Sequence, residues 1–125
     1  MMPEAFSKSN RMRVTFDYLP EFERGAKALR KKYPSFESDY DTFLDELEKN
    51  PYLGEPLGQH TYKYRMSIAS KGKGKSGGAR VLTYNLQKQS ENEVQITLMT
   101  IYDKSDIENV SDAYIRSLVE ERESR

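Results

Sequence analysis

The stretch "TYKYRMSIASKGKGKSGGARVLTYNL", residues 61–86, decides the fold. Its first eight and last eight residues alternate apolar and polar side chains, and a run of glycines and lysines separates the two segments. Alternation with a period of two residues is typical of a β-strand that buries one face. The stretch therefore predicts two strands joined by a flexible hairpin loop.

Each predicted strand divides its side chains between two faces. In the first strand, one face carries Tyr62, Tyr64, Met66 and Ile68, and the other carries Lys63, Arg65 and Ser67. In the second strand, Arg80, Leu82, Tyr84 and Leu86 share one face. Alternate aromatic residues on strands usually belong to the core, although such rings also stack on nucleic-acid bases. Because Arg80 begins its strand directly after the loop, we expect its guanidinium to reach solvent.

Downstream of the hairpin, residues 93–102 ("EVQITLMTIY") are apolar on both sides, which predicts a central strand. Residues 105–121 then show helical spacing of apolar side chains, and Ser105 with Glu108 forms a capping-box pattern at the start. The tail at 120–125 is highly charged, so we expect it to fray.

Upstream of the hairpin, residues 13–18 ("RVTFDY") alternate like a strand. Residues 19–33 and 36–50 each carry an apolar stripe at helical spacing, and Pro34 separates them. Two helices with so short a connection predict a helical hairpin. Residues 1–10 are polar and are expected to form a loose leader.

The order of elements is a strand, two helices, three strands and one helix. Consecutive strands with short connections favour an antiparallel sheet with helices packed on it. We therefore predict one α+β domain over residues 1–125, with about four antiparallel strands, an N-terminal helical hairpin and a C-terminal helix.

The charge of the chain is unevenly distributed. Twenty Lys and Arg balance twenty Asp and Glu overall, but residues 56–90 contain seven of the basic residues and no acidic one. This centre either faces a polyanion or forms a basic strand pair neutralised by acidic helices. The chain also has no cysteine, no apolar stretch of membrane-spanning length and no pattern of a secretory signal at its start. A cytoplasmic protein without disulfides is expected.

The glycine-rich loop is not expected to be a nucleotide-binding P-loop. Its "GKS" at residues 74–76 matches the end of that motif, but Ala69 stands where the motif requires its first glycine. A strand follows the loop, whereas a P-loop opens a helix that faces the phosphates. The loop either brings ammonium groups to a phosphate backbone or is simply solvated.

Four segments resemble the RelE/ParE superfamily of bacterial toxin–antitoxin toxins, and its HigB-like branch in particular. They are "LEKNPYLGEPL", "YKYR", "SKGKGKSGGARVLTY" and "LMTIYDKSDIENV", and they span about half of the chain, from Leu47 to Val110. The resemblance implies a RelE-like fold and a small endoribonuclease that uses no metal or other cofactor. It also implies that the enzyme cleaves messenger RNA on the ribosome, and that an antitoxin, which would mediate oligomerisation, is its partner.

The resemblance also implies the site residues. The family chemistry is attack of a ribose 2′-hydroxyl on the adjacent phosphate, which leaves a cyclic phosphate and a free 5′-hydroxyl. Matching positions suggest Arg80 as the phosphate clamp, with Lys104 or Lys75 as the acid or base. The expected RNA- and ribosome-binding residues are Lys63, Arg65, Lys71 and Lys73.

Other interpretations remain open from the sequence. One is a gyrase poison on the same fold, and another is a non-catalytic module that binds nucleic acid or an antitoxin. Arg80 could pair with a helix carboxylate instead of a phosphate. Tyr102 and Tyr114 are available near the last helix, and His60 is the only histidine, which excludes a ribonuclease that works with a histidine pair.

Overall fold

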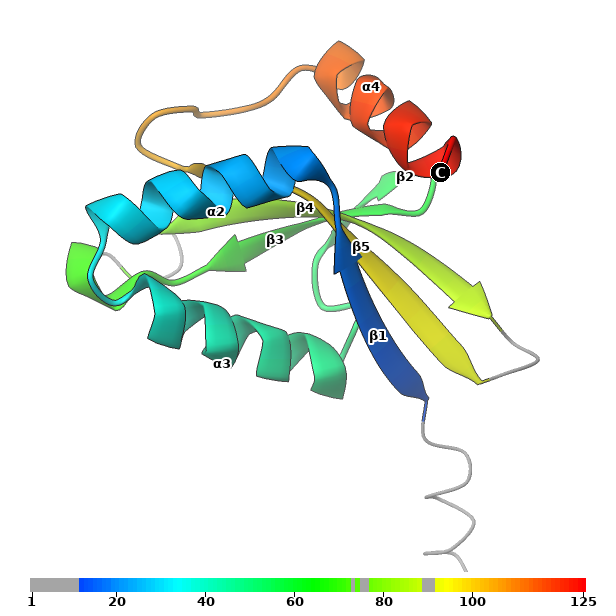
Figure 1. The fold of residues 1–125 in the computed structure, drawn as a ribbon, viewed down its shortest axis with the longest axis horizontal. Helices are drawn as coiled ribbons and strands as arrows, with labels where there is room; N and C mark the ends of the chain where they lie inside the picture. Colours follow the sequence, from blue (N-terminus) through cyan, green and yellow to red (C-terminus); the bar gives the residue numbers. More distant parts are fainter. Residues whose placement is uncertain (1–11, 73, 75–76, 89–91) are drawn as a thin grey trace, which may run out of the picture.

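A mixed sheet forms the centre of the computed structural model, which describes residues 12–72, 74, 77–88 and 92–125. Within these residues the sheet has five strands, in the order β1-β5-β4-β3-β2 (Figure 1). They are β1 (Arg13–Tyr18), β2 (Glu55–Gly58), β3 (Thr61–Met66), β4 (Ala79–Lys88) and β5 (Glu93–Asp103). Neighbouring strands are antiparallel except β1 and β5, which pair in parallel.

Helices cover both faces of the sheet. The side chains of α2 (Pro20–Lys32) and α3 (Phe36–Lys49) pack on one face, and those of α4 (Asp112–Glu123) pack on the other. A short 3-10 helix, Ala69–Lys71, follows β3. The two-sided packing is visible along β4, where Val81 joins the first cluster and the next residue, Leu82, joins the second.

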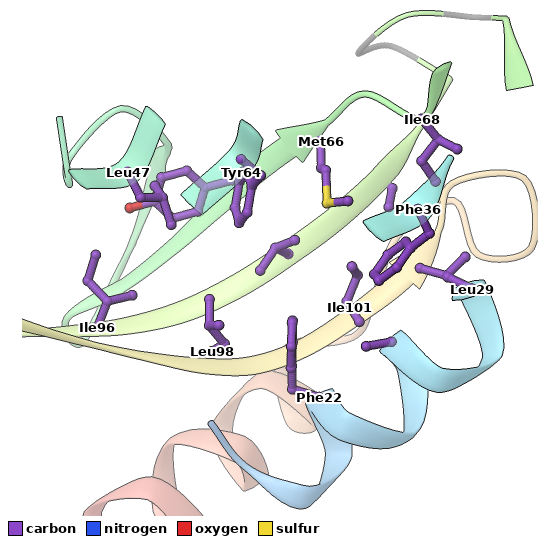
Figure 2. Close-up of a cluster of buried hydrophobic side chains, with 14 of the residues drawn as sticks. Phe22, Leu29, Phe36, Leu47, Tyr64, Met66, Ile68, Ile96, Leu98 and Ile101 are labelled. Atoms are coloured by element: carbon purple, nitrogen blue, oxygen red, sulfur yellow. The ribbon is translucent and has the colours of Figure 1, made fainter. Parts of the chain in front are cut away.

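The larger core lies between the sheet and the α2–α3 pair (Figure 2). Its labelled members are Phe22 and Leu29 of α2, Phe36 and Leu47 of α3, and Tyr64, Met66, Ile68, Ile96, Leu98 and Ile101 from the sheet and its continuation. Helix α2 approaches β5 so closely that a Cβ on Gly25 would lie 2.3 Å from the Ile101 carbonyl oxygen. Each fully buried Leu, Ile or Phe contributes about 1.5–3 kcal/mol, so this face holds the sheet rigidly behind the site described below.

The prediction of an α+β domain is confirmed, and two consecutive helices do follow the first strand. The prediction of about four antiparallel strands needs two corrections. Strand β2 escapes the pattern because its four residues include Pro56 and Gly58 and are all exposed, so no apolar alternation marks it. Strand β1 is parallel to β5, since α2 begins directly after β1 and packs back across β5.

The predicted start of the last helix is wrong. Helix α4 begins at Asp112, and Ser111 is its N-cap, with an Oγ that accepts from the Tyr114 backbone N–H. At the position predicted to cap, the Ser105 N–H donates to the Asp103 carboxylate at 2.8 Å. Asp103 thereby turns the chain out of β5, and residues 104–111 form an irregular connection instead of a first helical turn.

The end of the chain is also more ordered than expected, because α4 continues to Glu123. Arg122 donates to Thr97 of β5 at 2.6 Å, and the Tyr84 hydroxyl donates to Glu123 at 2.7 Å. These contacts hold a segment that its charge alone predicts to fray. The expected leader at 1–10 lies outside the described residues. None of the described helices combines the length and apolar character that crossing a membrane requires.

Candidate functional site

A cleft of about 560 Å³ opens beside β3. Strand β2 pairs with β3 only from Thr61 to Lys63, so the rest of this edge of β3 is left to border the cleft. Its walls come from α3, the turn before β2, strands β3 and β4, and the connection after β5. We call this hollow the basic cleft, and its cationic residues are Lys63, Arg65, Arg80 and Lys104. Four of the seven residues predicted from the sequence therefore lie around one hollow.

The two arginines of the basic cleft face each other across strands. Arg65 and Arg80 are direct partners in the β3–β4 ladder, which places their Cβ atoms about 4.5–5.5 Å apart. Burial, and then the positive charge of Arg65, lower the pKa of Arg80, although an arginine stays charged in a protein. Like charges directly opposite each other destabilise a sheet. The fold nevertheless keeps this arginine pair in a cleft, where a bound anion would relieve the repulsion between the two positive charges.

Arg80 does not reach solvent as expected, because only 6% of the residue is exposed. It lies in the middle of the sheet, between Arg65 on β3 and Tyr102 on β5. One guanidinium nitrogen donates to the Ala79 carbonyl at 3.2 Å. The side chain is therefore positioned by the sheet, and the sequence reasoning missed this because it treated the strand start as an edge.

Lys104 reaches the basic cleft because the residue after β5 stays hydrogen-bonded to the residue before β4. The Lys104 backbone N–H donates to the Gly78 carbonyl at 3.0 Å. Gly78 lies so close to β3 that a Cβ on it would stand 2.1 Å from the Met66 carbonyl oxygen. Gly78, the last glycine of the loop, thus lets β3, β4 and β5 come together next to Lys104. Lys104 itself is half-buried.

Lys71 is not part of the basic cleft. Its ammonium donates to the Asp103 carboxylate at 2.7 Å and to the Ser105 hydroxyl at 2.8 Å, and only 6% of its side chain is exposed. This ion pair ties the 3-10 helix to the end of β5. Because the ammonium is already paired with Asp103, we expect Lys71 to stabilise the fold instead of binding RNA.

Asp103 is the centre of this second group of charges. It also accepts hydrogen bonds from the Tyr33 hydroxyl at 2.6 Å, the Lys32 ammonium at 3.3 Å and the Ser105 backbone. Burial of the carboxylate acts to raise its pKa, but these hydrogen bonds, led by the one from Lys71, more than offset burial and hold the pKa of Asp103 far below its usual range. The network fixes the connection that carries Lys104.

The other two predicted lysines, Lys73 and Lys75, lie outside the described residues. On either side of Lys73, Gly72 and Gly74 have φ angles of 74° and 62°, a left-handed conformation that favours glycine. The alternation of glycine and lysine in the sequence is therefore matched by a backbone that needs glycine at these two positions.

Sequence reasoning missed the acidic side of the basic cleft. Glu46, Glu55 and Glu108 line it together with the four cations. Glu46 reaches the cleft from α3, and Glu55 reaches it through the pairing with Lys63 across β2 and β3. Neither position follows from local patterns, because both depend on how α3 and β2 meet the edge of β3. Carboxylates beside cations add candidate proton acceptors to the site.

The two tyrosines noted in the sequence have different surroundings. Tyr114 is engaged in packing α4, since its hydroxyl donates to Glu21 at 2.9 Å and lies 3.0 Å from the Thr100 hydroxyl. Tyr102 lies opposite Arg80, and its hydroxyl is buried without a hydrogen-bond partner among the described residues. Burial raises the pKa of Tyr102, against the opposing effect of Arg80.

Within the described part of the chain, no group of three or more His, Cys, Asp or Glu side chains is arranged to hold a metal ion. His60 packs beside Tyr84, with ring centroids 5.2 Å apart, at the β2–β3 turn.

No known protein-family model matches the sequence. Evidence for a function therefore comes from the chemistry of the basic cleft and from the resemblance of the four segments.

Proposed function

We propose that this chain is an endoribonuclease toxin similar to the HigB-like branch of the RelE/ParE superfamily. One observation carries the proposal: Lys63 and Arg65 of β3, Arg80 of β4 and Lys104 after β5 come from three separate segments of the chain and line one cleft. Guanidinium groups bind phosphate oxygens through paired hydrogen bonds, and ammonium groups add point charges. A cleft of this composition suits the phosphate of an RNA strand.

In the proposed reaction, the ribose 2′-oxygen loses its proton and attacks the adjacent phosphorus. The bond from phosphorus to the 5′-oxygen then breaks, and that oxygen takes up a proton. The products are a 2′,3′-cyclic phosphate and a free 5′-hydroxyl. The transition state carries extra negative charge on the phosphate oxygens, which is where preorganised cations contribute most.

The proposed roles divide between phosphate binding and proton transfer. Arg80, fixed by the sheet, clamps the scissile phosphate with Arg65 opposite it, and Lys63 holds the neighbouring backbone. Lys104 or Lys75 supplies the acid or base, and the carboxylates of Glu46, Glu55 and Glu108 are further candidates for accepting the 2′-hydroxyl proton. The reaction needs no metal, because cations of the chain stabilise the charge.

The resemblance adds the biological setting to this proposal. The substrate is messenger RNA on the ribosome, the protein acts in the cytoplasm, and a cognate antitoxin blocks the basic cleft until it is removed. The rival with most support from the same resemblance is a gyrase poison, which would leave RNA intact.

The test is cleavage of a translated message by the purified full-length protein, with and without EDTA. We expect cuts that primer extension maps within the reading frame, a cyclic phosphate on the upstream product, and no loss of activity with EDTA once ribosome integrity is controlled. Intact messages together with inhibited gyrase would instead support the gyrase poison. Cleavage that stops with EDTA would contradict the metal-free mechanism.

A further inference from the structure

Aromatic rings gather at a second place, around the closed end of the β2–β3 hairpin. The rings of Tyr52 and Tyr62 have centroids 5.6 Å apart and planes tilted by 55°. They border a recess of about 450 Å³ together with His60 and residues 85–87 of β4. This recess lies outside the basic cleft, and the proposed reaction does not use it.

Tyr62 only borders the larger core, and Tyr52 lies outside it. Tyr64 and Tyr84, on the same strands, are 3% and 5% exposed, whereas Tyr52 is 40% exposed and Tyr62 is half-buried. The sequence alone could not separate these tyrosines, because all but Tyr52 follow the same alternating pattern. The structure therefore leaves two aromatic rings available to a ligand.

The hairpin turn beside the rings has a strained backbone. Gln59 and His60 have φ angles of 51° and 64°, in the left-handed region that bulky residues rarely adopt. Tight hairpin turns of this kind favour Asn and Gly at these positions. The Asn85 backbone N–H holds the turn by donating to the His60 carbonyl at 2.8 Å. Backbone strain of this kind is found mainly at functional sites. Here the strained turn places the His60 imidazole beside the recess.

The segment that carries Tyr52 is also fixed in advance. The Pro51 carbonyl accepts from the Tyr64 hydroxyl and from the Asn85 side-chain amide, the latter at 2.9 Å. The Tyr52 backbone N–H donates to the Asn50 side chain at 3.2 Å. A segment whose backbone is held in place before binding loses little conformational entropy when a ligand binds to it.

The recess and the basic cleft are connected along the chain. Tyr52 is followed by Leu53 and Gly54, which line the cleft, and Tyr62 is followed by Lys63. Residues that are adjacent in the chain therefore border the two hollows. A single strand of the usual ~4–16 nucleotides is long enough to occupy two neighbouring hollows, and residues 56–90, which include Tyr62 and Lys63, contain no acidic residue.

We propose that Tyr52, Tyr62 and His60 form a stacking site for the bases of single-stranded RNA whose backbone continues into the basic cleft. The proposal rests on the proposed function in one respect, namely that the basic cleft binds the RNA backbone. The stacking of bases on the rings is a separate contact. Stacking on aromatic rings is tolerant of base identity. The site therefore adds affinity for unpaired RNA without demanding a sequence at these nucleotides.

The test uses the full-length protein and a 12-nucleotide RNA made uncleavable by 2′-O-methyl groups, with 2-aminopurine as a fluorescent base. Tyr52→Leu and Tyr62→Leu should each weaken binding by roughly 5- to 150-fold, the effect of losing one stacked base. They should also reduce the quenching of 2-aminopurine. Tyr52→Phe and Tyr62→Phe keep the ring and should bind like the parent.

The salt dependence separates this site from the basic cleft. The leucine variants should keep the parental slope of log affinity against log salt, because they remove no phosphate contact, whereas Arg65→Ala should flatten it. Tyr52→Leu is the deciding variant if Tyr62→Leu lowers the melting temperature, since Tyr52 is the more exposed ring. Parental RNA affinity in Tyr52→Leu would overturn the proposal, and so would equal losses of affinity in the phenylalanine variants. If the RNA binds as expected but messages stay intact, the stacking site stands and the proposed cleavage fails.

Discussion

Replacing Asp103 with asparagine should destabilise the protein strongly. The carboxylate is 3% exposed, and the Lys71 side chain that donates to it is 6% exposed. A neutral amide at this position would leave that ammonium buried without its counter-charge, and removing one partner of a buried ion pair costs about 3–5 kcal/mol. Each kcal/mol lowers the melting temperature of a domain of this size by roughly 3–5 °C. We therefore expect a fall of about 9–25 °C.

The pH dependence provides an independent measure of the same contact. Because the pKa of Asp103 is lower in the folded protein than in the unfolded chain, its stabilisation is fully present above about pH 5. It is lost progressively as the pH falls through the ordinary aspartate pKa of about 3.9 toward the lower pKa of the folded state. Melting temperatures measured from pH 7 to pH 3 should fall more steeply for the parent than for Asp103→Asn.

Two variants control this experiment. Asp106→Asn changes an exposed carboxylate that lies 3.9 Å from Lys32, and it should melt like the parent. Lys71→Met should lower stability by about 1–3 kcal/mol, since Asp103 keeps its other donors, and should leave RNA binding unchanged. An unchanged melting temperature in Asp103→Asn would refute the buried network. A Lys71→Met variant that melts like the parent but binds RNA weakly would return Lys71 to the RNA-binding residues.

Three further predictions concern the basic cleft and its supports. Gly78→Ala should lower the melting temperature, because the new Cβ would stand 2.1 Å from the Met66 carbonyl oxygen; a parental melt would contradict the close packing. Arg80→Ala should cost more stability than Arg116→Ala on the exposed face of α4, and equal melts would argue that Arg80 is not held by the sheet. Arg65→Ala should flatten the salt dependence of single-stranded RNA binding by about 0.7 per phosphate contact, so an unchanged slope would exclude such a contact.

Local patterns predicted the parts of the fold that repeat along the chain. The alternation in residues 61–68 and 79–86 gave both strands of the hairpin and the shared face of Lys63 and Arg65. The same reasoning failed where distant contacts decide. The exposed strand β2 has no pattern of its own, the parallel pairing of β1 depends on how α2 packs, and Asp103 overrides the capping signal at Ser105.

The site was predictable in composition but not in arrangement. The acid-free segment and the resemblance pointed to Lys63, Arg65, Arg80 and Lys104, and all four line the basic cleft. Lys71 has the same sequence signal as its neighbours in the loop, and only the buried Asp103 distinguishes it. The acidic wall of the cleft and the exposed ring of Tyr52 arise from tertiary packing, for which a single sequence carries no local sign.

The measurement that tests the central claim most directly is single-turnover cleavage of a ribosome-bound message by Lys104→Met, at saturating enzyme. Lys104 is a better probe than Arg80, because its half-buried side chain can be replaced with less effect on the fold. Lys31→Met, at an exposed position on α2, is the matched control. If Lys104 acts as the acid or base, we expect its variant to melt like the parent and to cleave ~10²–10⁴-fold more slowly, while Lys31→Met keeps the parental rate. Parental cleavage by Lys104→Met would remove Lys104 from the reaction, and absence of cleavage by the parent itself would contradict the proposed function.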